Sequence, residues 1–464
     1  MGDFVVRLSS LTLKNVKNVK NGTILMPMSN EKLHSVDSAE ILGIYGQNGS
    51  GKTAIVDALY FLQQIMLGQS IDQSIIDYIG VDDDRAHMCV EFKIFFEEKL
   101  YEAGYNIWLK INDGAVEIER EFLNCAINHD GKRTNKNIFM DYVRSDSESI
   151  FKPYRRLDEL IGKNKERKTD LIVARKMAEK SNCSYIFGES SREIFCQEVE
   201  DKFKDYSNVI GALFEFSLKD LFVIRNTHSG MISANFLLPM AFRIGNNMIG
   251  AKGDFAIPLT KPVVLDEAKK VILDAIVDQI NIVLYTIIPG LRIDVKDYGQ
   301  QVLDSGEEGW KVELMSVREG KVPIPIRMES EGIIKIISIL NVLIQAFGNS
   351  SICLVIDELD AGIFEYMLGE LLDIFEKSAK GQLIFTSHNL RALEMLDKKS
   401  IMFSTVNPDN RYIHMKSVKE NNNLRSMYIR SITLGGQDEK IYEETDSLKI
   451  ARAFRKAGRS LHNE

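Results

Sequence analysis

The sequence has 464 residues, more than one typical hydrophobic core contains, and an ordinary globular composition, so it predicts two or three lobes. The net charge of −8 argues against a surface coated uniformly for nucleic acid, and five cysteines without a C-x-x-C pair predict a reducing, cytoplasmic location. We find no signal peptide and no apolar run of about 18 residues, so we expect no membrane-embedded protein.

The N-terminal stretch, residues 5–28, predicts two strands joined by a polar turn. Apolar residues recur through its first part, and the polar, turn-rich segment 13–22 follows. This hairpin fits two interpretations. It is either a wall on the base side of a nucleotide or a solvated hairpin.

The octapeptide GQNGSGKT at residues 46–53 fits the P-loop pattern G-x-x-x-x-G-K-[ST]. An apolar run at 40–45 predicts a buried strand before it, and helical periodicity follows it. In such a loop, backbone N–H groups surround the α- and β-phosphates, Lys52 reaches the β/γ-phosphates and Thr53 holds Mg²⁺. The residues expected to bind the nucleotide are Gly46, Asn48, Gly49, Ser50, Gly51, Lys52 and Thr53.

Alternating segments at 88–96, 100–111 and 115–122 predict an antiparallel sheet beside the P-loop sheet. Residues 141–288 predict a mostly helical insertion. Within it, residues 152–180 carry ten Lys/Arg against five Asp/Glu. That basic run fits a contact with nucleic acid or an acidic protein, or the commoner solvated helix face.

The second half of the chain predicts a return to sheet structure. We expect an aperiodic loop at 226–254, an amphipathic helix at 265–288 and strands between 291 and 326. An apolar helix at 332–348, a buried strand at 352–356, a helix at 364–379 and a second buried strand at 382–386 follow. The tail, 419–464, is polar, rich in arginine and without low complexity, and its acidic block at 443–446 fits a solvated turn or a partner contact.

Two carboxylates and a histidine follow the buried strands. Asp357 and Glu358 come directly after the strand at 352–356, at the end of a parallel sheet where ligands bind. Asp357 is expected to hold Mg²⁺ through its water shell, and Glu358 to orient or deprotonate the attacking water. His388 ends the next strand, where it can donate to a γ-phosphate.

Together these motifs resemble the ABC-type ATPases. Their order matches: the P-loop, a Ser-x-Gly signature in MESEGIIKI, then LVIDELDAG and FTSHN. The resemblance implies that Ser330 and Gly332 contact the γ-phosphate held by a second subunit, and that Asp360 lies in the loop crossing between subunits. It therefore implies two ATP molecules sandwiched in a head-to-tail homodimer of heads, or a larger homo-oligomer.

The signature departs from the LSGGQ of transporters, and the hairpin, the insertion and DELDAG are more similar to the RecF/SMC-head branch. The chain most resembles OLD-like ATPases of prokaryotic anti-phage systems (abortive-infection and PARIS-like). That resemblance implies an ATP-driven switch controlling a separate effector, a nuclease or toxin. The alternative is a RecF/SMC-like DNA-binding ATPase in repair or recombination. Only 76 residues follow His388, too few for the Toprim nuclease domain of full OLD proteins.

The predicted fold class is therefore α/β: an ABC-ATPase head, in which a P-loop mixed sheet lies beside an antiparallel β subdomain, plus a mostly helical insertion. The predicted division is 1–140 and 289–420 for the head, 141–288 for the insertion and 421–464 for a tail. A Q-loop glutamine cannot be assigned. The candidates by proximity alone are Gln63, Gln64, Gln69 and Gln73.

Overall fold

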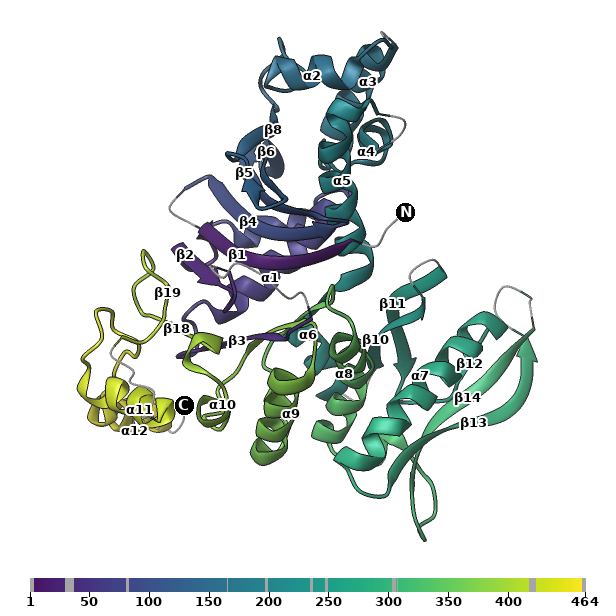
Figure 1. Ribbon diagram of the computed structural model, residues 1–464. Helices are drawn as coiled ribbons and strands as arrows, with labels where there is room; N and C mark the ends of the chain where they lie inside the picture. Colours follow the sequence, from purple (N-terminus) through teal and green to yellow (C-terminus); the bar gives the residue numbers. More distant parts are fainter. Residues whose placement is uncertain are drawn as a thin grey trace.

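The computed structural model describes residues 4–29, 37–80, 83–164, 166–196, 199–233, 237–246, 249–302, 306, 308–416 and 423–460. Two large sheets form its centre, and further elements project from them (Figure 1). The helices α2–α4 lie at one end of the molecule, α7 with β12–β14 at a second, and α11 with α12 at a third (Figure 1). The predicted α/β class, with a P-loop sheet, an antiparallel sheet and helical segments, is confirmed.

The P-loop sheet has six strands in the order β19-β18-β3-β17-β16-β9. All neighbours pair in parallel except β19, which pairs antiparallel with β18. Its strands are short and almost wholly buried, as continuous apolar runs require when helices cover both faces. Their bounds are β3 (Glu40–Tyr45), β9 (Leu221–Ile224), β16 (Cys353–Ile356), β17 (Gln382–Thr386), β18 (Ile401–Ser404) and β19 (Tyr412–Ile413).

Helices cover the two faces of this sheet. The P-loop helix α1 (Lys52–Met66) packs on one face, where it shares a core with alternate strand residues such as Leu42 and Val355. Helices α8 (Glu331–Gly348) and α9 (Glu365–Ser378) pack on the opposite face with Ile41 and Leu354. α8 is long and apolar enough to cross a membrane, but 61% of this 18-residue helix is buried inside the protein.

The antiparallel sheet has seven strands and the order β2-β1-β4-β5-β6-β7, with β8 also paired to β6. The N-terminal hairpin is confirmed, with Val16 opposite Val19 at its turn. Helices α2–α5 pack on this sheet and share its core. The bounds are β1 (Val5–Val16), β2 (Val19–Leu25), β4 (Arg85–Phe96), β5 (Lys99–Asn112), β6 (Ala115–His129), β7 (Lys132–Arg133), β8 (Asn137–Val143), α2 (Tyr154–Ile161), α3 (Glu166–Ser181), α4 (Glu189–Cys196) and α5 (Asp201–Glu215).

A third hydrophobic core lies between α7 and a second antiparallel sheet. This sheet has the strand order β12-β14-β13, and β15 pairs with β14. Apolar side chains from one face of α8 complete this core. The hairpin β10–β11 packs beside α8. The bounds are α6 (Asn226–Ser233), β10 (Leu237–Asn246), β11 (Ile249–Pro258), β12 (Val263–Leu265), α7 (Glu267–Ile287), β13 (Leu291–Val302), β14 (Glu308–Arg318), β15 (Ile324–Pro325), α10 (Ala392–Met395), α11 (Leu424–Leu434) and α12 (Ser447–Ser460).

Two details of the predicted organisation are wrong. The segment 141–288 is not one helical insertion, because β9 within it is an edge strand of the P-loop sheet. The predicted loop 226–254 contains α6, β10 and part of β11. The tail, for which no element was predicted, contains α11 and α12. A four-residue strand and a glycine-rich hairpin carry too little periodicity to be recognised, and their partners lie far away in the sequence.

A buried ion pair joins the two large sheets. Arg7 of β1 donates to Glu40 Oε2 of β3 at 2.8 Å, and both side chains are at most 4% exposed. Gln382 of β17 donates to the same carboxylate oxygen at 2.8 Å and to the backbone oxygen of Leu8 at 2.8 Å. The antiparallel sheet is therefore fixed to the sheet that carries the P-loop.

Replacing Arg7 with Met should destabilise the protein by about 3–5 kcal/mol, because it leaves the Glu40 carboxylate buried without its cation. Urea unfolding measures the change. Arg85→Met is the matched control, since Arg85 pairs with Glu119 on the exposed side of the same sheet and its side chain is 49% exposed. Equal losses of unfolding free energy in the two variants would contradict a special role for the buried Arg7–Glu40 ion pair.

Candidate nucleotide site

The loop between β3 and α1 has the backbone conformation of a phosphate-binding loop. Gly51 has φ 91° and forms the N-cap of α1 in the left-handed region, which glycine adopts without steric cost. At Gly46 an ideal Cβ would lie 1.9 Å from Ser404 Oγ of β18, so only glycine fits there. Ser50 Oγ bonds to the Gln47 oxygen at 2.6 Å and to Ser404 Oγ at 2.5 Å, so Ser50 supports the loop from beneath. Asn48 and Gly49 lie exposed at its tip.

Lys52 is only 7% exposed and folds back over this loop. Its Nζ donates to the backbone oxygens of Gly46 at 2.8 Å and of Gln47 at 3.1 Å. Burial lowers the pKa of Lys52, and the nearby carboxylates of Asp357, Glu358 and Asp360 oppose that shift. The ammonium group is thus in place between the loop and the acidic residues.

Asp357 lies beside Thr53 of the P-loop helix, although 304 positions separate the two residues in the sequence. Thr53 Oγ1 lies 3.5 Å from Asp357 Oδ1, which also accepts a hydrogen bond from Thr386 Oγ1 at 2.6 Å. Asp357 is 1% exposed, and its Oδ2 is buried with no hydrogen-bond partner among the described residues. A hydroxyl and a carboxylate with a spare buried oxygen are hard oxygen donors, so this pair fits Mg²⁺.

Glu358 lies directly beside this pair in a strained conformation. It has φ 49°, an uncommon value for a residue with a side chain, and such strain concentrates at functional sites. Its N–H donates to Thr386 Oγ1 at 2.7 Å, and its backbone oxygen accepts a hydrogen bond from Lys335 Nζ. Thr386 and Lys335 therefore hold the backbone of Glu358 from two sides.

Asp360 and His388 lie at the same edge of the sheet. The backbone N–H of His388 donates to Asp360 Oδ2 at 3.1 Å, while the imidazole is exposed. Partial burial lowers the pKa of His388, and the positive charge of Lys52 lowers it further. A neutral imidazole can donate from one nitrogen to a phosphate oxygen.

The two signature residues lie at the start of α8. Ser330 is the N-cap, and its hydroxyl accepts a hydrogen bond from the Ile333 N–H at 3.5 Å. An ideal Cβ at Gly332 would lie 1.9 Å from the backbone oxygen of Gly362. The structure thus brings Gly332 against the loop that contains Glu358 and Asp360.

Gly332→Ala should destabilise the protein by about 1–3 kcal/mol, because its Cβ would displace either α8 or the backbone at Gly362. Gly348→Ala, at the other end of α8, is the control: an ideal Cβ there meets no described atom within 4 Å. Chemical denaturation of both variants measures the difference. If Gly332→Ala were as stable as Gly348→Ala, α8 would not be packed as tightly on this loop as the structure shows.

Three contacts join distant segments of the chain to the P-loop. The hairpin β1–β2 does lie beside it, with Asn18 Nδ2 donating to the Gly49 oxygen. Tyr412 Oη donates to the Gly51 oxygen at 2.7 Å. The Glu443 N–H donates to Gln47 Oε1 at 2.9 Å, which brings the acidic block of the tail to the loop.

Among the four glutamines considered for a Q-loop, Gln63 has a structural role. Its amide nitrogen donates to the backbone oxygens of Ser217 at 3.1 Å and Leu221 at 2.6 Å, so it supports the start of β9. Gln73 Oε1 accepts from the Val116 N–H at 2.8 Å in the antiparallel sheet.

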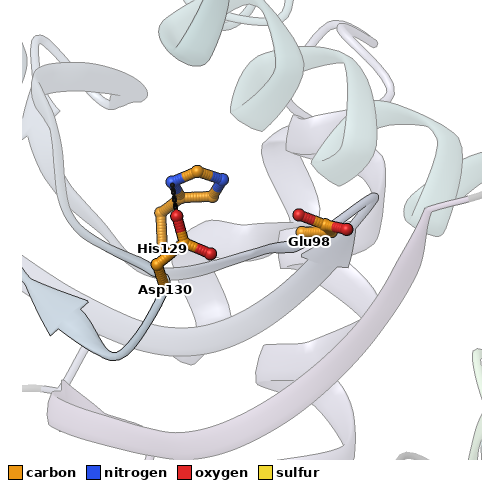
Figure 2. Close-up of side chains that lie close together, drawn as sticks. All are labelled: Glu98, His129 and Asp130. Atoms are coloured by element: carbon orange, nitrogen blue, oxygen red, sulfur yellow. Dashed lines mark ion pairs between the residues drawn. The ribbon is translucent and has the colours of Figure 1, made fainter.

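Another group of potential metal ligands lies at hairpin ends of the antiparallel sheet. Glu98 follows β4, His129 ends β6, and Asp130 lies in the turn between β6 and β7 (Figure 2). His129 Nδ1 is 3.4 Å from Asp130 Oδ2. All three side chains are exposed, and such groups are common on protein surfaces without a metal.

No protein-family model and no curated protein matches the sequence. Among solved structures, the SMC head domain from Thermotoga maritima is 14% identical with a TM-score of 0.35, and the match covers 88% of this chain and 99% of that one. An SMC head bound to the C-winged helix domain of ScpA is 15% identical with a TM-score of 0.38, covering 88% and 96%. The SMC head with an extended coiled coil from Pyrococcus furiosus, bound to the C-terminal domain of ScpA, is 14% identical with a TM-score of 0.37, covering 88% and 96%.

The class of this protein follows from its own fold and site. It is an α/β P-loop protein in which a mostly parallel sheet carries the P-loop and an antiparallel sheet lies beside it. Its acidic loop follows the strand two places from the P-loop strand, with β17 between them.

Proposed function

We propose that this protein is an ATP-hydrolysing switch of the ABC type. The observation that carries the proposal is the meeting of Thr53 and Asp357 at 3.5 Å, beside the buried Lys52. Lys52 and Thr53 belong to the P-loop, and Asp357 belongs to the distant acidic loop. Together they place one ammonium group and two oxygen donors beside the phosphate-binding loop. Phosphoryl transfer to water needs that combination of charges.

Each residue then has a role in the reaction. The P-loop N–H groups and Lys52 bind the phosphates, and Thr53 and Asp357 hold Mg²⁺, which neutralises charge on the β- and γ-oxygens when it is bound. Glu358 orients the attacking water and accepts its proton, and His388 donates a hydrogen bond to the γ-phosphate. Glu358 has φ 49° directly after Asp357, so its backbone turns away from the strand path at the end of β16.

The geometry of α8 supports a dimer of heads as the active form. Ser330 is at an exposed helix N-terminus, the end that favours anions, and Gly332 is packed on the loop of Asp360. The two parts expected to meet a second subunit therefore belong to one surface. ATP held between two P-loops and two such surfaces would close the dimer, and hydrolysis would reopen it.

Phosphate release by the purified protein tests the enzymatic part of the proposal. Turnover should require Mg²⁺ and stop with EDTA, and size-exclusion chromatography should show association that depends on ATP. A protein that binds MgATP but releases no phosphate, as monomer and dimer alike, would contradict an ATPase switch.

We further propose that the switch belongs to a prokaryotic anti-phage system and controls a separate effector. The resemblance of DELDAG and of the tail segments 424–430 and 434–437 to OLD-like ATPases supports this role. In the described residues, the only other cluster of potential metal ligands is the exposed group of Figure 2, so an effector activity would reside on another protein. Plaque counts on cells carrying the locus test the role: protection should disappear with Lys52→Ala.

A DNA-binding ATPase of the RecF/SMC kind is the second candidate, and exposed lysines on α3 favour it. Lys168, Lys176 and Lys180 are exposed there. Other basic residues of the 152–180 run are already used, since Arg156 pairs with Glu159 and Arg175 with Glu179. Duplex binding that weakens with salt, by a slope of about −0.9 per phosphate contacted, would support this candidate.

A further inference from the structure

A single buried lysine in the signature helix contacts the acidic loop. Lys335 is the only Lys or Arg between Ser330 and Asn349, and it interrupts an otherwise apolar run. It is 5% exposed. Lysine is almost never buried to this extent unless other groups compensate its charge.

The partners of Lys335 all belong to the acidic loop. Its Nζ donates to the backbone oxygen of Glu358, the residue with φ 49°. Burial lowers the pKa of Lys335, while Asp360, Glu358 and Asp357, in that order, oppose the shift. With Lys52 on the P-loop side, two buried lysines thus face three carboxylates.

The same turn of α8 is fixed to this loop by packing. Gly332, three residues before Lys335, is held against the Gly362 oxygen. On the neighbouring faces of α8, Ile334 and Ile337 enter the third core and Ile336 and Ile339 enter the core of the P-loop sheet. A displacement of the start of α8 would therefore be carried to the backbone of Glu358 through one hydrogen bond.

We propose that Lys335 is a positioning residue that couples the start of the signature helix to the general base Glu358. It holds the Glu358 backbone in the left-handed conformation from which the carboxylate can face the attacking water. It also places a fixed cation near the three carboxylates, which offsets their mutual repulsion before phosphate and metal arrive. This inference rests on the proposed ATPase function and names a residue outside its motifs.

Steady-state ATP hydrolysis by Lys335→Met tests the inference. The methionine keeps much of the side-chain length in the apolar helix but removes the cation and the donor. We expect kcat to fall by about 10–100-fold, the usual effect of removing a group that orients a catalytic or metal-binding residue, with KM nearly unchanged. Ile339→Val is the matched control in the same helix, and its kcat should stay within about twofold of the wild-type value, because it perturbs packing without touching the loop.

A double variant separates positioning from a general structural effect. If Lys335 acts through the Glu358 carboxylate, Lys335→Met should cause little further loss in the Glu358→Gln background, because coupled groups are not additive. Single-turnover measurements give both rates. A further 10-fold loss in that background would overturn the inference. If Lys335→Met does not fold, Lys335→Gln, which keeps a donor without the charge, serves in the same cycle.

The outcomes also separate this inference from the proposed function. Wild-type turnover that Lys52→Ala abolishes, together with unchanged kcat in Lys335→Met, overturns the inference and leaves the ATPase intact. A wild-type protein that hydrolyses no ATP overturns both.

Discussion

Lys52→Ala should reduce ATP hydrolysis at least about 100-fold and weaken nucleotide binding, because it removes the P-loop cation that neutralises charge on the β- and γ-phosphates. In the structure the Lys52 ammonium group donates to the backbone oxygens of Gly46 and Gln47. The same group can turn from these oxygens to a phosphate bound in the loop. Phosphate release and binding of a fluorescent ATP analogue measure the two effects.

Thermal unfolding adds a readout that does not depend on turnover. The wild-type protein should gain about 2.7 kcal/mol of stability at an ATP concentration 100 times Kd, and Lys52→Ala should lose most of that gain. The unfolding temperature of each variant without nucleotide is its own reference, because Lys52→Ala also removes a cation from near the buried Asp357 carboxylate. Lys132→Ala, on the exposed strand β7, is the control and should keep the full gain. An undiminished gain in Lys52→Ala would show that the nucleotide binds elsewhere.

Glu358→Gln should keep ATP binding but lose about 10²–10⁴-fold in hydrolysis, the range that general acid–base catalysis contributes. The amide preserves the shape and the backbone contacts to Thr386 and Lys335, while it cannot accept a proton from water. Glu365→Gln, at the exposed start of α9, is the control and should hydrolyse ATP normally. Wild-type turnover in Glu358→Gln would assign the base to another residue.

The same variant should accumulate the ATP-closed dimer and whatever that state binds. Size-exclusion chromatography with ATP measures the dimer, and purification from cells that also express the neighbouring genes, followed by mass spectrometry and a 260/280 nm ratio, identifies the bound partner. A stoichiometric protein without nucleic acid would support the defence switch. Bound DNA without a protein partner would favour the repair ATPase instead.

The parts of the site that could be predicted are those whose geometry is local. The P-loop pattern needs only a strand, a few glycines and a helix in succession, and residues 40–66 fold that way. Asp357 and His388 were predicted at the edge of the sheet because parallel strands end together there, and β16 and β17 are indeed parallel neighbours. Thr386 lies in FTSHN, but the motif assigns it no role, although its hydroxyl bonds both Asp357 and Glu358.

The α/β class, the P-loop, the acidic-loop residues and most helices and strands can be predicted from the sequence, because backbone periodicity and glycine positions act over a few residues. Three features become visible only in the folded chain: β9 joins the P-loop sheet, Arg7 joins the two sheets through Glu40, and Lys335 reaches Glu358. These contacts join segments that lie from 23 residues apart, for Lys335 with Glu358, to 132 residues apart, for Leu221 of β9 with Cys353 of β16. Strand order and helix packing bring such segments together, and neither leaves a periodic signal in the chain.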